Sequence, residues 1–307
     1  MWGNGKAALG RYVWAAPALM VLAGLGAARA DGPLNAHSLA PAIKASAPVV
    51  AAPLHLAPTK PPRSAALNPN FVPTVSGCTA RREFTRFDHP LLHTALRLAS
   101  GKPLVIVAIG SSSTAGAGAS SPAASYPSRL AAELKDRLRG HVVKVVNRGV
   151  NGEVVSQMMA RFASGVVAER PQLVLWQLGT NSVLRNRPLQ PHSRDLLQGI
   201  EELKNIGADV VLIDPQYAPR VIAKPETPSM VDQIAIAARD EDVDLFHRFG
   251  IMRDWYVTQH RSFDVFVSPD GLHMNDWGYA CWAKLLAASV VQAANPPVAS
   301  AMPGAVP

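Results

Sequence analysis

A carboxylate and an imidazole lie three residues apart in this chain of 307 residues, in segment 269–273 (PDGLH). A serine cluster lies far upstream, in segment 110–114 (GSSST). A serine hydroxyl is a weak nucleophile at neutral pH, so it needs an imidazole to accept its proton and a third group to orient that imidazole. The spacing allows Asp270 to orient His273 within one loop or helical turn. Together the two segments indicate a serine hydrolase.

Apolar runs rich in β-branched residues alternate along the chain with stretches of helical period. The expected strands are residues 104–109, 142–146, 173–177, 210–213 and a weaker run at 243–246. The expected helices are residues 126–138, 154–169, 195–206, 230–240 and 276–294. Continuous apolar strands separated by helices indicate βαβ units whose sheet is covered on both faces. Because such crossovers are right-handed, we expect an α/β fold, a three-layer α/β/α sandwich with a mostly parallel five-stranded sheet.

The unusual loop sequences of this chain fall where the expected strands end. They are residues 110–116 (GSSSTAG), 147–152 (NRGVNG), 179–182 (GTNS), 214–217 (DPQY) and 270–273 (DGLH), the last of which precedes the final helix. Ligands of open α/β sheets bind outside the carboxyl ends of the strands. We therefore expect these five loops to converge on one rim of the sheet.

Three residues in these loops offer the other groups that acyl transfer at a serine needs. Ser112 lies on a glycine-flanked turn between strand and helix, where its hydroxyl and its backbone N–H can face the same point. Gly149 lets the backbone approach a ligand closely and offers a second N–H. Asn181 offers a side-chain amide. Such donors stabilise the oxyanion of a tetrahedral intermediate.

In order along the chain, these segments resemble the four sequence blocks of the SGNH, or GDSL-type, serine hydrolases. The resemblance implies a flavodoxin-like α/β/α fold, no cofactor, and ester hydrolysis or transacetylation on lipids, acylated sugars or cell-wall polymers. Carried over to this sequence, Ser112 is the nucleophile, His273 the base and Asp270 its orienting residue. The resemblance also implies an oxyanion hole. The backbone N–H groups of Ser112 and Gly149 and the amide of Asn181 form it.

The chain departs from the family pattern at two positions within the matching span, residues 104–279. The family usually has Asp before the nucleophile, where this chain has Ser111. That position supports the turn, so the difference concerns the rigidity of the loop more than catalysis. Ser182 follows Asn181 where Asp is common in the family.

The loop after the fourth expected strand has two interpretations. Asp214, Gln216 and Tyr217 could line the substrate groove or could form a structural turn. We do not expect a metal site, because the chain has no C-x-x-C or H-E-x-x-H motif and its nine histidines are scattered. The glycines of segment 110–116 do not form a phosphate-binding P-loop, since no Gly-Lys-Ser/Thr follows them.

The two ends of the chain differ from its centre. Residues 1–30 combine a basic start, an uncharged stretch and Ala-Arg-Ala, which predicts a secretory signal peptide cleaved near Ala30. An uncleaved membrane anchor is the alternative. Residues 31–77 are rich in alanine and proline and predict an extended, disordered tether, and residues 295–307 predict a similar tail. One domain remains, residues 78–294, and cleavage would place it in the periplasm or the medium without stable membrane insertion.

The net charge of the chain is +8. Removal of the expected signal peptide, with its three basic and no acidic residues, lowers it to +5. Arg81, Arg82 and Arg86 cluster at the start of the domain, either as a solvated face or as a contact for an anionic cell-envelope polymer. Nucleic acid is not an expected partner, because basic and aromatic residues do not interleave.

Cys78 and Cys281, the two cysteines of the chain, lie at opposite ends of the expected domain. In an exported protein such a pair can form a disulfide. Two buried free thiols are the alternative, because Cys281 lies in an apolar helix.

The sequence therefore predicts an exported serine esterase that removes short acyl groups, with acetyl as the first candidate, from a carbohydrate or cell-envelope polymer. An O-acetyltransferase with the same triad is a second enzymatic interpretation, in which a sugar hydroxyl replaces water. A non-catalytic carbohydrate-binding protein on the same fold is the third. A missing nucleophile, base or oxyanion donor would favour the third interpretation, and none is missing.

Overall fold

A computed structural model of the chain describes residues 77–295. The predicted signal peptide lies outside these residues, as do the tether up to residue 76 and the tail from residue 296. Within the described part, no helix has the length and apolar character needed to cross a membrane.

The centre of the domain is a five-stranded sheet in the order β2-β1-β3-β4-β5. All four pairs of neighbouring strands are parallel. The strands are β1 (Leu104–Gly110), β2 (Val143–Gly149), β3 (Leu173–Gln177), β4 (Asp209–Ile213) and β5 (Asp244–Phe246). The predicted fold class is confirmed.

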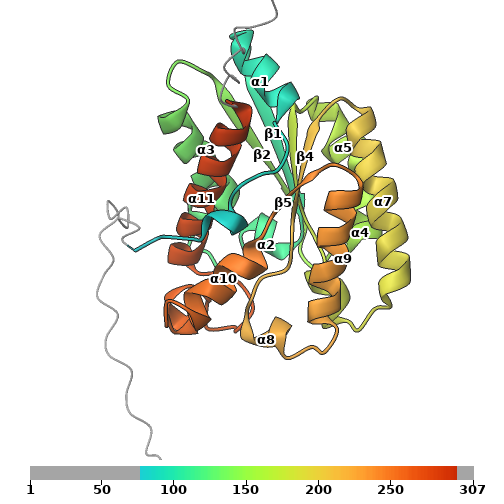
Figure 1. The fold of residues 1–307 in the computed structure, drawn as a ribbon, viewed down its shortest axis with the longest axis vertical. Coiled ribbons are helices and arrows are strands. Elements are labelled where there is room, and N and C mark those ends of the chain that lie inside the picture. The colour runs from blue at the N-terminus through green and yellow to red at the C-terminus, as the bar shows by residue number, and fades with distance from the viewer. Residues whose placement is uncertain (1–76, 296–307) are drawn as a thin grey trace, which may run out of the picture. The chain divides into compact units, whose positions relative to one another are not determined.

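Helices cover both faces of this sheet (Figure 1). The α-helices are α1 (Leu92–Ala99), α2 (Ser112–Ala115), α3 (Tyr126–Arg137), α4 (Val155–Met159), α5 (Phe162–Gly165), α6 (Thr180–Leu184), α7 (Leu189–Asn205), α8 (Pro219–Ile222), α9 (Thr227–Asp240), α10 (Arg248–Val257) and α11 (Asp276–Ala294). Four 3₁₀ turns, η1 (Arg82–Phe84), η2 (Pro122–Ala124), η3 (Val167–Glu169) and η4 (Phe263–Val265), complete the described elements.

Strand β1 shows why the sheet is buried on both sides. Its residues Leu104, Ile106 and Ala108 pack in one core with α1, α3, α10 and α11. Val107 and Ile109 point the other way, into a second core with α4, α5, α7 and α9. Because successive side chains of a strand point to opposite faces, a continuous apolar run fits a sheet enclosed by two helical layers.

The predicted helix 154–169 is wrong as a single element. The chain there forms α4, α5 and η3. The first break falls at Arg161, whose φ of −118° and ψ of 14° lie outside the helical region. Its side chain is turned toward the ends of β1 and β2, as described below.

A disulfide joins Cys78 to Cys281 in the structure, with the Cα atoms 5.4 Å apart. It connects the start of the described chain to α11, which packs against α3 on one face of the sheet. Trp255 adds a second tie, because its indole Nε1–H donates a hydrogen bond of 2.8 Å to the carbonyl of Thr79. Cys78 and Thr79 are thus bonded to α11 and α10.

Candidate active site

The serine cluster forms the turn between β1 and α2. Ser111 precedes α2 and Ser112 is its first residue, while Gly116 ends the helix in the left-handed region with a φ of +104°. Ser111, Ser113 and Thr114 are buried, whereas Ser112 is partly exposed. Within the cluster, Ser112 is therefore the serine best placed to meet a substrate.

Ser112 and His273 lie within hydrogen-bonding distance although 161 residues separate them. The distance from Ser112 Oγ to His273 Nε2 is 2.8 Å, and that from His273 Nδ1 to Asp270 Oδ2 is 2.5 Å. With the proton on Nδ1, the ring donates to Asp270 and accepts from the serine hydroxyl. This arrangement matches the nucleophile, base and orienting carboxylate of a serine hydrolase.

Asp270 is held by its own loop. Its Oδ1 accepts hydrogen bonds from Ser268 Oγ at 2.7 Å, from the backbone N–H of Leu272 at 2.8 Å and from that of His273 at 2.9 Å. Partial burial opposes ionisation, but the hydrogen bonds from Ser268, His273 and Leu272 outweigh it and hold the pKa of Asp270 well below its usual range. The carboxylate is therefore ionised and oriented at neutral pH.

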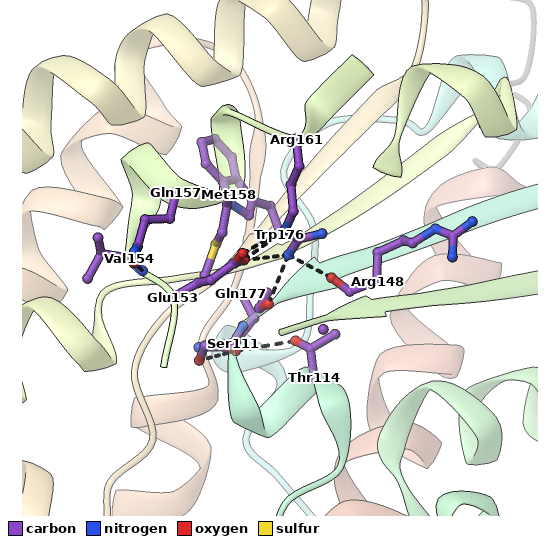
Figure 2. A network of polar contacts seen from close by, with 12 residues as sticks. Ser111, Thr114, Arg148, Glu153, Val154, Gln157, Met158, Arg161, Trp176 and Gln177 are labelled. Carbon is purple, nitrogen blue, oxygen red and sulfur yellow. Dashed lines mark hydrogen bonds and ion pairs between the residues drawn. The ribbon is translucent and has the colours of Figure 1, made fainter. Parts of the chain in front are cut away.

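The turn that carries Ser112 is supported by Gln177, the last residue of β3. Its Oε1 accepts hydrogen bonds from the backbone N–H of Ser111 at 3.0 Å, from Ser111 Oγ at 3.1 Å and from Thr114 Oγ1 at 3.2 Å (Figure 2). A carboxylate at position 111 would face this oxygen instead of donating to it. The serine that replaces the family's Asp therefore suits its neighbour, and the turn is anchored.

The backbone N–H of Gly149, a predicted oxyanion donor, is already engaged. It donates a hydrogen bond of 2.9 Å to Asn147 Oδ1. An added Cβ would lie 2.1 Å from the backbone nitrogen of Ala115. Gly149 thus permits α2 to pack directly on β2, and its engaged N–H argues against the predicted role as an oxyanion donor.

Gly152, three residues further on, offers an N–H in the same loop. Its φ is +80°, and within residues 77–295 its N–H has no hydrogen-bond partner. The Nδ2 of Asn181 donates a hydrogen bond of 2.9 Å to the carbonyl of Glu153, the next residue, so Asn181 lies beside this loop. The amide of Asn181 keeps a second N–H. Both glycines belong to the same predicted loop, and the structure distinguishes them by φ, by the space around a Cβ and by whether the N–H is engaged.

Gln216 does not line a substrate groove, contrary to the groove interpretation. Its side chain is buried, with 1% of its surface exposed. The Oε1 atom accepts from Thr180 Oγ1 at 2.8 Å and from Arg248 Nη2 at 3.0 Å, and the Nε2 donates to the carbonyl of Leu272 at 3.1 Å. Gln216 therefore connects the element that carries Asn181 to the loop that carries His273.

Tyr217, by contrast, is partly exposed and belongs to an aromatic cluster. Its ring lies 5.2 Å from Phe249, 6.0 Å from Phe263 and 6.1 Å from Tyr256, measured between ring centroids. Asp214, the third candidate of this loop, is fully buried. Asp214 cannot contact a substrate in this arrangement.

Asp214 and Arg248 form a buried polar unit beneath the site. Arg248 Nε donates a hydrogen bond of 2.9 Å to the carbonyl of Asp214, and Asp214 Oδ1 accepts one of 2.8 Å from the backbone N–H of Phe249. Burial, opposed by these hydrogen bonds and by the charge of Arg248, raises the pKa of Asp214 to about 7. Sequence reasoning missed this unit, because neither residue's burial is visible in a single sequence.

No group of three or more His, Cys, Asp or Glu side chains able to hold a metal ion occurs among residues 77–295. The groups that lie together at the rim are a hydroxyl, an imidazole, a carboxylate and N–H donors. This set fits acyl transfer at Ser112, with the roles considered below.

Known proteins resemble this chain in sequence and in fold. An arylesterase from Vibrio mimicus is 32% identical over 100 residues, which are 31% of this chain and 49% of that protein. The match therefore spans about half of the relative's length. A two-domain esterase described as active on acetylated mannans has a similar structure, with a TM-score of 0.61, 16% identity, and coverage of 71% of this chain and 58% of that one.

A mutant of an acetyl-xylooligosaccharide esterase from Geobacillus Stearmophilus also has a similar fold, with a TM-score of 0.52 and 18% identity over 61% of this chain and 94% of that one. The model of the Non-GDSL lipase-like family matches residues 77–296, which is more than half of the chain. The predicted resemblance to SGNH and GDSL-type hydrolases is confirmed. The chain belongs to the Non-GDSL lipase-like family.

Proposed function

We propose that this protein is a serine ester hydrolase in which Ser112, His273 and Asp270 form the catalytic triad. The observation that carries the proposal is the unbroken line of hydrogen bonds from Ser112 Oγ through the His273 ring to Asp270. Its members come from segments far apart in the sequence, and the line reaches the partly exposed Ser112. A structural role alone does not account for a hydroxyl held in this way at the rim of the sheet.

In the proposed reaction, Ser112 Oγ attacks the ester carbonyl carbon while its proton passes to His273 Nε2. The carbonyl oxygen becomes an oxyanion, which accepts hydrogen bonds from the N–H groups of Ser112, Gly152 and Asn181. His273 then gives the proton to the leaving alcohol oxygen, and an acyl-serine remains. Water repeats the sequence and releases the acid. Asp270 keeps the ring oriented and stabilises its positive charge in each transition state.

For the substrate we propose short acyl esters, with acetyl first, on a carbohydrate or cell-envelope polymer. Two proteins of similar fold support this class, since one is described as active on acetylated mannans and the other as an acetyl-xylooligosaccharide esterase. An O-acetyltransferase would use the same residues with a sugar hydroxyl in place of water. Analysis of the products with and without an acceptor sugar distinguishes hydrolysis from transfer.

The proposal is tested with p-nitrophenyl acetate and with a fluorophosphonate that labels activated serines. We expect the wild type to hydrolyse the ester and to carry the label on Ser112, and Ser112→Ala to lose both. Ser113→Ala is the matched control, because Ser113 is a buried neighbour in the same turn, and it should remain active. Hydrolysis by Ser112→Ala, or labelling at another serine, would contradict the assignment and favour a non-catalytic role for this site.

We also propose that the protein is exported, with its mature chain starting near Asp31. The composition of residues 1–30 supports this proposal, as does the Cys78 to Cys281 disulfide, because such bonds persist in oxidising compartments. Mass analysis of the native N-terminus in each cell fraction tests it. Recovery of an intact Met1 terminus from membranes would favour the anchor instead.

A further inference from the structure

Arg161 lies at the break between α4 and α5, and its guanidinium reaches three segments at the rim. Its Nη2 donates hydrogen bonds to the carbonyl of Arg148 at 2.9 Å and to that of Gly110 at 3.4 Å. Its Nε and Nη2 contact the carboxylate of Glu153, at 2.9 Å and 2.6 Å from Oε2 (Figure 2). One side chain thus holds the end of β1, the end of β2 and the loop before α4.

The Arg161 and Glu153 side chains are largely withdrawn from water, with 20% and 13% of their surfaces exposed. An ion pair in this position interacts more strongly than one on the surface, and loss of one partner leaves the other charge poorly solvated. The planar guanidinium can donate from two edges at once, to a carboxylate and to carbonyls. A lysine carries the same charge but has no such fork.

Arg161 contacts the segments that position the proposed oxyanion donors. Gly110 leads directly into the turn of Ser112. Glu153 follows Gly152, and its backbone carbonyl accepts the hydrogen bond from Asn181 Nδ2. Arg161 contacts the side-chain carboxylate of Glu153. The relative positions of the donors therefore depend on where Arg161 holds Glu153.

We infer that Arg161 and Glu153 are a positioning pair that sets the oxyanion hole against the nucleophile. This inference rests on the proposed esterase function. Oxyanion donors act on charge that develops only in the transition state, so a displaced donor lowers kcat more than it changes KM. Neither residue touches the substrate in this account.

The test compares Arg161→Lys and Glu153→Gln with Glu169→Gln. Glu169 is the matched control, because it also pairs with basic side chains, Arg148 and Lys144, and is similarly withdrawn at 18% exposure, but neither its hydrogen bonds nor its ion pairs reach residues 149–154. With p-nitrophenyl acetate we expect kcat to fall about 10- to 100-fold in the two variants, with KM within about twofold of the wild type. The control should keep the wild-type kcat.

A second measurement does not depend on activity. Hydrogen exchange of peptide 149–154 should be faster in Arg161→Lys and Glu153→Gln than in the wild type, and unchanged in the control. A wild type that hydrolyses no ester would contradict the proposed function. Hydrogen exchange would still decide whether Arg161 holds residues 149–154 in place. The inference is overturned if exchange and kcat stay at wild-type values in both variants, or if Glu169→Gln changes them equally.

Discussion

Three adjacent serines have different environments, although the sequence makes them look alike. Ser111 donates to Gln177, Ser112 bonds to His273 and Ser113 is buried. The order of the blocks was enough to predict which serine meets the histidine. It was not enough to choose between Gly149 and Gly152, because the choice depends on which N–H is already engaged. The burial of Gln216 was equally hidden, since its contacts come from three separate segments.

The support of the nucleophile turn by Gln177 leads to a prediction at this scale. In Gln177→Leu, the buried donors of Ser111 and Thr114 lose their acceptor, which costs about 1 to 3 kcal/mol of unfolding free energy. We also expect a lower kcat, because the turn that carries Ser112 loosens. Urea unfolding and p-nitrophenyl acetate kinetics measure the two effects.

Gln172→Leu is the matched control for Gln177→Leu. Gln172 precedes β3 at the opposite end of the sheet, and its Oε1 accepts one hydrogen bond, from the backbone N–H of Val105 at 3.0 Å. This variant should lose stability without losing kcat per folded molecule. A Gln177→Leu protein with unchanged kcat would show that the turn does not need this support.

At the scale of elements, the strands were predictable and one helix was not. The apolar runs gave all five strands, because a strand enclosed on both faces must be apolar throughout. Residues 154–169 have a helical pattern, yet the chain breaks at Arg161, whose side chain bonds to the ends of β1 and β2. Tertiary hydrogen bonds decide this break, and they leave no local signal.

The packing of α2 on β2 leads to a second prediction. In Gly149→Ala, the new methyl group would lie 2.1 Å from the backbone nitrogen of Ala115, so α2 must move. Overpacking of this kind costs about 1 to 3 kcal/mol. We expect lower stability and a lower kcat, since α2 begins with Ser112. Gly140→Ala is the control, because a Cβ there meets no atom within 4 Å, although its φ of +88° adds strain. Its kcat should not change.

At the scale of the whole molecule, a buried carboxyl group makes stability depend on pH. The pKa of Asp214 is about 7 in the folded protein, above its ordinary value of 3.8. The folded state therefore holds this proton more tightly than the unfolded state. The resulting stabilisation is complete below about pH 4 and is lost as the pH rises toward 7, by at most about 1.4 kcal/mol per pH unit.

Asp214→Asn isolates this contribution. The asparagine keeps an oxygen to accept the hydrogen bond from Phe249 but does not titrate. Urea unfolding of both proteins from pH 4 to 8 gives the difference in unfolding free energy. We expect the wild type to lose stability relative to the variant as the pH rises from 4 to 7. A constant difference would mean that Asp214 is not protonated in the folded protein over this range.

The disulfide ties the two ends of the domain together, and the sequence already allowed it. Cys78 lies 203 residues from Cys281, so reduction releases a long loop in the unfolded state. In the chain-entropy model such a bond contributes on the order of 4 to 5 kcal/mol, although measured values often fall short. We expect no free thiol in denatured, unreduced protein, and a lower midpoint of urea unfolding after reduction. The double variant Cys78→Ser with Cys281→Ser should match the reduced protein and be insensitive to reductant. Two titratable thiols in protein purified without reductant would contradict the bond. An unchanged midpoint of urea unfolding on reduction would show that the ends are held together without the disulfide, by the hydrogen bond from Trp255 to Thr79 and by the packing of α11.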